Sequence, residues 1–216
     1  MIKRLFATFC AAAVFTVSSA QMNSGGFRLD NRSVYYGLRM GFTSSHLGGD
    51  FDTDAKTGLN LGMVVGLRCS PYIPMFLESG IYYTERGGKE GGLSTPLGRA
   101  SIKYNLGYIE VPVLMKYGIG IADEFAILPY VGPNFAVGVG GQTKETHPGE
   151  TAIKYDSFGS DKFNRFDVGI KLGCGFEWNM VYAEVGYNWG ITNISDFRDD
   201  SETFNRAFYM NIGINF

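Results

Sequence analysis

The sequence predicts an all-β protein: an eight-stranded antiparallel up-and-down transmembrane β-barrel. The main observation lies between Phe166 and Ile191, where large apolar residues alternate with small or charged ones and only Asn179 and Met180 interrupt the pattern. This period of two is typical of two β-strands joined by a tight turn. The apolar face carries no charge. We therefore expect that face to meet lipid and the polar face to line the interior of a barrel.

The second observation is a secretory signal in residues 1–20. Lys3 and Arg4 precede an apolar stretch that ends in small residues, and this stretch is shorter than the roughly 20 residues that a membrane-spanning helix needs. The sequence therefore predicts export, with a short periplasmic segment over 21–32 and the barrel over 33–216.

The third observation is the last strand, which alternates up to the terminal aromatic residue. A strand that ends in this way resembles the sorting signal of bacterial outer-membrane barrels. We expect the cell outer membrane as the location and assign this role to the apolar face formed by Phe208, Met210, Ile212, Ile214 and Phe216.

The same alternation identifies five further strands. Their apolar faces cover Val34–Phe42, Leu59–Leu67, Leu77–Tyr83, Ile109–Tyr117 and Ile127–Val139. With the final three strands the number is eight, and an even number lets an antiparallel meander close with both ends at the same rim.

Long and short connections alternate between these strands. The short ones lie near 70–74, 118–124 and 179–180, and the long, polar ones cover 44–57, 87–103, 141–165 and 192–205. We expect the long connections to be surface loops and the short ones periplasmic turns. Trp178 and Trp189, on the apolar face near opposite rims, are predicted to lie in the two aromatic girdles.

The predicted interior holds five positive and five negative side chains. An eight-stranded barrel is just wide enough for side chains to fill, and charges confined there need partners. One interpretation is a path for protons, ions or solutes, or a catalytic carboxylate pair. The favoured one is a neutral, interlocked plug, with Arg68 and Glu78 paired across their hairpin. The ten residues are Arg39, Arg68, Glu78, Arg86, Glu110, Lys116, Asp167, Lys171, Glu177 and Glu184.

Pro112, Pro129 and Pro133 fall within predicted strands, where each removes a ladder hydrogen bond. Pro112 is expected opposite Gly132, with a bulge or loosened pairing at that point.

A calcium-binding loop is excluded although Asp50, Asp52 and Asp54 reproduce its opening. Ala55 stands where glycine is required and Leu61 where the bidentate glutamate should be. A looser divalent-cation site in this segment is left open, but no metal site or cofactor is predicted.

The two histidines are the candidates for catalysis. His46 and His147 lie near Asp50, Glu145 and Glu150, so a surface His–acid dyad is conceivable. Outer-membrane proteases with such dyads are larger, ten-stranded barrels, and no predicted strand carries the outward histidine of lipid-modifying barrels. We therefore predict no catalytic residue.

The composition limits the classes of partner and the covalent cross-links that we expect. A net charge of −2 gives no reason to expect nucleic acid. Cys69 and Cys174 lie on strands that are not neighbours, so no disulfide is expected. Aromatic residues in the polar connections can be binding anchors, but more often such residues pack loops together or lie at the membrane interface: Phe51, Tyr155, Phe158, Phe163, Phe197 and Phe204.

Three stretches resemble the PorT-like outer-membrane β-barrel family. They are Leu77–Lys89, Gly107–Tyr117 and Leu128–Pro133, and the matching residues are Glu78, Gly87, Tyr108, Glu110, Pro112, Lys116 and Tyr117. The resemblance implies an eight-stranded barrel in a Gram-negative outer membrane. Some relatives take part in protein secretion, and the family carries no catalytic residue over to this chain.

The leading functional hypothesis is a non-enzymatic barrel with a filled polar lumen that anchors four surface loops for adhesion, envelope integrity or partner binding. The alternative is transport, as a narrow pore or an accessory component of a secretion system. A membrane-embedded hydrolase ranks third. The expected partners are outer-membrane lipids, the barrel assembly machinery and a surface or secretion protein.

Overall fold

The computed structural model describes residues 33–49, 53–70, 72–95, 98–122, 124–146, 152–158, 163–195 and 202–216. The predicted signal peptide and periplasmic segment, residues 1–32, lie outside this part of the chain. So do Asp50, Phe51, Asp52, His147, Glu150 and Phe197. Within the described part, no helix is long and apolar enough to cross a membrane.

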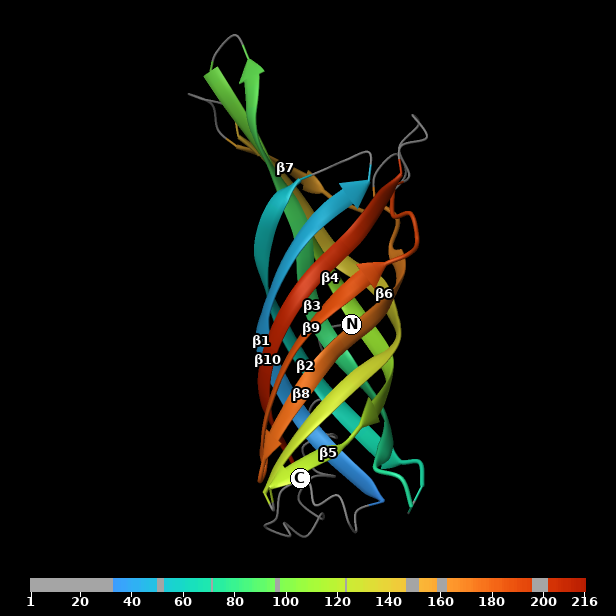
Figure 1. Cartoon of the computed structure of the whole chain (residues 1–216). Helices are drawn as coiled ribbons and strands as arrows, with labels where there is room; N and C mark the ends of the chain where they lie inside the picture. Colours follow the sequence, from blue (N-terminus) through green and yellow to red (C-terminus); the bar gives the residue numbers. More distant parts are fainter. Residues whose placement is uncertain are drawn as a thin grey trace, which may run out of the picture.

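Eight long antiparallel strands form a closed ring (Figure 1). The pairing runs from β4 through β3, β2, β1, β10, β9 and β8 to β6, and β4 pairs with β6 to close it. This confirms the predicted eight-stranded up-and-down barrel. The strands are β1 (Val34–Gly49), β2 (Asp54–Arg68), β3 (Met75–Thr95), β4 (Gly98–Tyr117), β6 (Phe125–Thr146), β8 (Phe166–Trp178), β9 (Val181–Gly190) and β10 (Thr203–Asn215).

Two short strands accompany the ring. β5 (Ile119–Ala122) follows β4 after Gly118 and pairs with the start of β6. β7 (Ile153–Asp156) pairs with the far end of β6.

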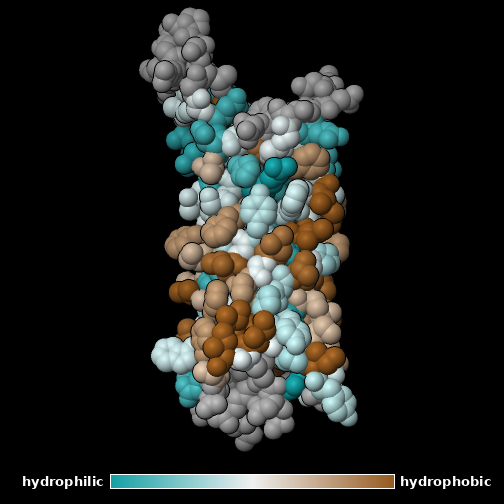
Figure 2. Space-filling view, viewed as in Figure 1, coloured by the Kyte–Doolittle hydropathy of each residue, from teal (hydrophilic) through white to brown (hydrophobic). Residues whose placement is uncertain are grey.

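The outer surface carries a belt of exposed apolar residues. Phe42, Trp178 and Ile212 are 66%, 62% and 59% exposed, whereas the residue on one side of each is buried: Thr43, Glu177 and Asn211. Figure 2 shows apolar residues over the middle and lower barrel and hydrophilic ones above. We call this surface the apolar belt. Towards the upper rim its last residues are Phe42, Leu59, Tyr83, Ile109 and Val139.

The strands continue well beyond the apolar belt, which corrects the predicted loops. β1 and β2 leave only 50–53 between them, and β3 and β4 leave only 96–97. β6 runs on to Thr146, and the β3–β4 hairpin projects beyond the ring (Figure 1). Above the belt the outward residues are polar, so the apolar outer face that reveals a strand ends although the backbone pairing continues.

The prolines loosen one ladder, two positions from the expected place. Pro112 lies opposite Asn134, not Gly132, and the β4–β6 pairing resumes only at Met115 and Val131. The loosened pairing is therefore confirmed and its predicted register is wrong. The register shift of this ladder lies higher, between Gly107 and Tyr108.

Inward-facing glycines make room for tyrosine rings. Gly186 lies opposite Tyr209, and a β-carbon there would come within 2.5 Å of that ring and 2.8 Å of the Tyr130 hydroxyl. Gly175 and Gly62 are covered in the same way by Tyr182 and Tyr82. Much of the interior is therefore filled by rings that use the space left by a missing side chain.

Candidate functional site

The lumen contains two clusters of buried charges. In the upper one, both oxygens of the Glu110 carboxylate are in ion pairs, one with Arg86 and the other with Lys171 at 2.7 Å. Arg86 also lies 3.0 Å from Asp167. Asn205 donates a hydrogen bond to Asp167 at 3.3 Å. Four strands are joined by these contacts, since the four charged residues belong to β3, β4 and β8 and Asn205 to β10.

The lower cluster is organised around Glu78. Its carboxylate lies 2.8 Å from Lys116 Nζ and 3.6 Å from Arg39 Nη2. It also accepts a hydrogen bond from the Tyr35 hydroxyl at 2.6 Å. Lys116 lies 3.9 Å from a second carboxylate, that of Glu184. The cations of both clusters are thus paired, which burial of a charge requires.

Tyrosines fill the space between the clusters. The hydroxyls of Tyr130 and Tyr209 are hydrogen-bonded at 2.9 Å. Lys116 lies 4.8 Å from the Tyr130 ring centre and Lys171 lies 5.0 Å from that of Tyr209. Ammonium groups at this distance over a ring are attracted by its electrons, so the tyrosines hold the cations as well as excluding water.

An apolar cluster lies in the upper part of the lumen; we call it the apolar cap. Phe158 packs edge-on against Tyr108 at 5.7 Å, and Phe163 packs in the same way against Tyr104 at 5.5 Å. Two of the predicted loop aromatics are therefore packing residues, whereas Tyr155 is 41% exposed. The cap comprises Leu47, Tyr104, Leu106, Tyr108, Ala136, Phe158, Phe163 and Ile194.

Nine of the ten predicted lumen charges are buried inside the barrel. Arg68 is the exception: it is half-buried at the lower rim, where its Nε donates a hydrogen bond to Ser70. The predicted pairing of Arg68 with Glu78 is wrong in register, because Arg68 lies opposite Phe76 and Glu78 lies opposite Gly66. The Tyr35 ring covers Gly66 and its hydroxyl donates to Glu78, and this carboxylate pairs with Arg39 and Lys116 instead.

The residues that carry the PorT-like resemblance belong largely to the lumen. Glu78, Tyr108, Glu110 and Lys116 are all buried there. Glu177, the remaining lumen acid, accepts a hydrogen bond from Asn215 at 2.6 Å.

The outward residues lie as their parity indicates. Trp178 is next to the β8–β9 turn, and Trp189 lies further up the barrel, opposite Ile170 and Arg206. The apolar residues of the last strand point outward from β10, which pairs with β1. Phe216 exchanges two backbone hydrogen bonds with Tyr36 at 2.9 Å.

His46 corrects the expectation that no strand carries an outward histidine. It belongs to β1, above Phe42, and lies opposite Arg206. Within the described residues, no hydrogen bond or salt bridge joins His46 to an acid, and no group of three metal-ligating side chains is present. Cys69 and Cys174 are both free thiols.

Sequence reasoning missed the tyrosine filling and the apolar cap. The signal for the tyrosines was present, since Tyr82, Tyr130 and Tyr182 share the inward parity of the charges. Three residues of the apolar cap have no such signal, because Phe158, Phe163 and Ile194 lie in irregular segments without periodicity.

Comparison with known proteins decides the family. The family model described as the outer membrane protein beta-barrel domain matches residues 19–196. The chain belongs to this family. This outer-membrane barrel is accordingly a protein of the cell outer membrane, with its apolar belt in contact with lipid. A search among curated proteins finds no match.

Several solved outer-membrane barrels are similar to the chain. The attachment invasion locus protein Ail of Yersinia pestis is 13% identical, with a TM-score of 0.44, over 86% of this chain and 100% of that one. Neisserial surface protein A is 12% identical, with a TM-score of 0.46, over 86% and 98%. A major outer membrane protein of Thermus thermophilus is 10% identical, with a TM-score of 0.49, over 86% and 100%.

Proposed function

We propose that this outer-membrane barrel is a non-enzymatic, non-conducting anchor that presents its upper end at the cell surface for adhesion, envelope integrity or partner binding. The observation that supports this proposal is the filled lumen. Paired charges, tyrosines and the apolar cap occupy its length, and every buried cation of the two clusters is engaged by a carboxylate. A lumen of this width filled in this way leaves no continuous water column.

The upper end of the barrel is suited to presenting a binding surface. The strands extend beyond the apolar belt as a rigid, paired framework, and the β3–β4 hairpin projects furthest in Figure 1. The PorT-like resemblance adds a secretion protein to the candidate partners of this end, and the barrel assembly machinery is expected to insert the protein.

Conductance separates an anchor from a pore. We expect the purified protein in a planar bilayer to give no steady single-channel current, because ions cannot pass the apolar cap. Gramicidin added afterwards to the same bilayer checks that currents are detectable. Reproducible current steps that scale with the amount of protein would contradict the anchor and favour the transport alternative.

A further inference from the structure

Four exposed lysines face one another across neighbouring strands on the outer surface. Lys89 of β3 lies opposite Lys103 of β4, Lys103 lies opposite Lys144 of β6, and Lys144 lies opposite Lys154 of β7. Residues directly opposite in an antiparallel pair share a face, so the four side chains form one line. We call them the lysine row.

The lysine row is electrostatically unfavourable in isolation. Like charges directly opposite on adjacent strands destabilise a sheet. Asp54 lies opposite Lys89 at one end, but no ion pair joins any of the four lysines to a carboxylate of the described residues. Within the described residues no ion pair balances the row, and an external anion can supply a counter-charge.

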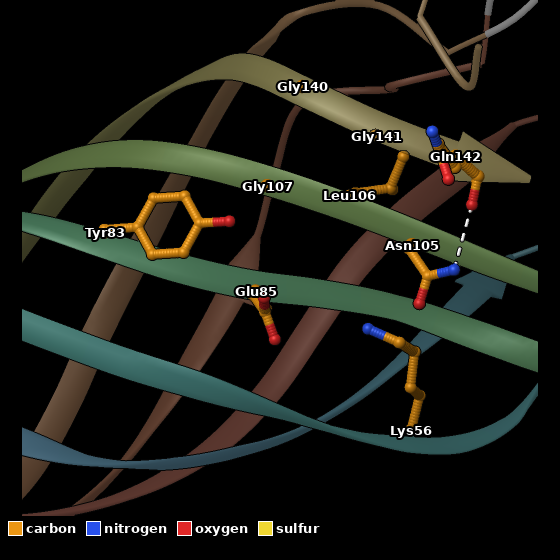
Figure 3. A pocket seen from close by; sticks show the side chains of 9 residues that line it. All are labelled: Lys56, Tyr83, Glu85, Asn105, Leu106, Gly107, Gly140, Gly141 and Gln142. Carbon is orange, nitrogen blue, oxygen red and sulfur yellow. Dashed lines mark hydrogen bonds between the residues drawn. The ribbon is translucent and has the colours of Figure 1, made fainter. Parts of the chain in front are cut away.

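A pocket of about 400 Å³ lies directly below the lysine row, on the outer surface of β3, β4 and β6 (Figure 3). Gly140 leaves it open, since a β-carbon there would meet no atom within 4 Å. The polar side chains of Lys56, Glu85 and Asn105 line it. Asn105 donates a hydrogen bond to the backbone oxygen of Gln142 at 2.9 Å.

Lys56 extends the positive charge into the pocket. Its ammonium group donates a hydrogen bond to the backbone oxygen of Arg86 at 3.3 Å. Burial lowers the pKa of Lys56, and Lys103 and Lys89 lower it further, whereas Glu85 raises it. Lys56 thus lies within the field of the lysine row.

The pocket connects the apolar belt with the lysine row. Tyr83, at the upper border of the belt, lines the pocket, and Lys89 lies six positions further along the same strand. Six residues of a strand tilted by about 40° rise by about 15 Å. The headgroup layer of a plain phospholipid is only about 5–8 Å thick on each side. The strand positions of the row therefore lie above the level of a phospholipid phosphate, which favours a larger headgroup.

We propose that this outer face binds a phosphorylated glycolipid of the outer leaflet, with its acyl chains along the apolar belt, its sugars in the pocket and its phosphates on the lysine row. The proposal rests on the proposed function in one respect, the orientation of the upper end towards the cell exterior. Amide, carboxylate and ammonium groups in the pocket supply the donors and acceptors that sugar hydroxyls need. The lysines supply point charges for phosphate.

The test measures binding of purified lipopolysaccharide to the full-length protein in zwitterionic micelles. The probes are intact lipopolysaccharide, the same material after enzymatic dephosphorylation, and inorganic phosphate. We expect Lys103→Gln to weaken binding of the intact lipid about fivefold, because each lysine near such a surface contributes about that factor. Gly140→Leu is expected to weaken it by filling the pocket. Dephosphorylated lipid should bind the wild type at least about fivefold more weakly.

Arg206→Gln is the matched control. Arg206 also points outward above the apolar belt, but from β10, and it contacts the Trp189 ring. Its replacement removes the same charge and should leave lipid binding unchanged. Equal losses for Arg206→Gln and Lys103→Gln, equal binding of both lipid forms, or full competition by inorganic phosphate would each overturn the proposal.

The stability of the Lys103→Gln variant gives a second test, in which no loss is expected although lipid binding weakens. In lipid-free micelles Lys103→Gln should unfold at the same or a higher urea concentration than the wild type, since it relieves repulsion from Lys89 and Lys144. A loss of stability would show that Lys103 has a structural role and would overturn the inference. Neither the binding result nor the stability result depends on whether the lumen conducts ions. The proposed lipid site and the proposed anchor can therefore be contradicted independently of each other.

Discussion

Glu110 holds two cations of the lumen at once. One carboxylate oxygen is paired with Arg86 and the other with Lys171. The side chain is fully buried, and the two cations come from different strands, β3 and β8. At the residue scale, a single carboxylate therefore balances the charge of two neighbours that cannot reach water.

Replacement of Glu110 by glutamine should be strongly destabilising. Glutamine keeps the shape but leaves two buried cations with one carboxylate, Asp167, so we expect a loss of about 3–5 kcal/mol in the free energy of unfolding. Urea unfolding in micelles measures it. Asp54→Asn, an exposed acid outside the network, should change this free energy by less than about 0.5 kcal/mol. Similar values for both variants would argue against a paired network.

Parity predicts the direction of a side chain but not its partner. The inward orientation of Glu78, Glu110 and Lys116 follows from a period of two. The partner of Glu78 depends on the register across the hairpin and on the reach of each side chain in the lumen. Glu78 is held by Tyr35, Arg39 and Lys116 from two other strands, which no local pattern reveals.

At the scale of elements, irregular segments complete the barrel interior. Ser157 and Phe158 follow β7, and Ser157 shares a hydrogen bond with Thr143 of β6 at 2.9 Å. This contact helps place Phe158 in the apolar cap. A segment predicted as a surface loop thus contributes to the core.

Phe158→Ala should destabilise the upper end of the barrel. Removal of a buried ring leaves a cavity beside Tyr108, with an expected loss of about 3–5 kcal/mol. Thermal unfolding followed by tryptophan fluorescence measures it. Tyr155→Ala, an exposed ring three residues away, should have a much smaller effect. If the two losses were equal, Phe158 would not be a core residue.

The upper ends of the strands are the part of each element that the sequence pattern does not predict. Alternation identifies each strand only where one face meets lipid and the other the lumen, as in Ile109–Tyr117. Above this level β4 continues to Gly98 through residues such as Lys103 and Asn105, which are polar and outward. The number and order of the strands were therefore predictable, but not their height or the lysine row.

At the scale of the whole molecule, the apolar belt sets the depth of the barrel in the membrane. Its residues on β10 run from Phe208 to Ile214 and include Ile212. Ile212 is 59% exposed and meets lipid. The cost of a charge on this surface should follow depth, because the midplane of the hydrocarbon is the level furthest from water on either side.

Ile212→Lys should cost about 2–4 kcal/mol in lipid vesicles. Ser44→Lys, outward on β1 above the belt, should cost close to zero because its ammonium group stays in water. Reversible unfolding in guanidinium with vesicles present measures both. Equal costs would place the membrane at a different height on the barrel.

The seam between β1 and β10 joins the two ends of the barrel sequence. Leu38 pairs with Ile214, and Ser44 pairs with Phe208, across nearly the whole length of the ring. The other long ladders join neighbours in sequence and can form as hairpins, but this one can form only after every other strand has been made. Until then both seam strands present unpaired backbone groups that would template aggregation. Closure of the seam therefore competes with self-association during assembly. Any factor that shields these two strand edges raises the yield of folded barrel.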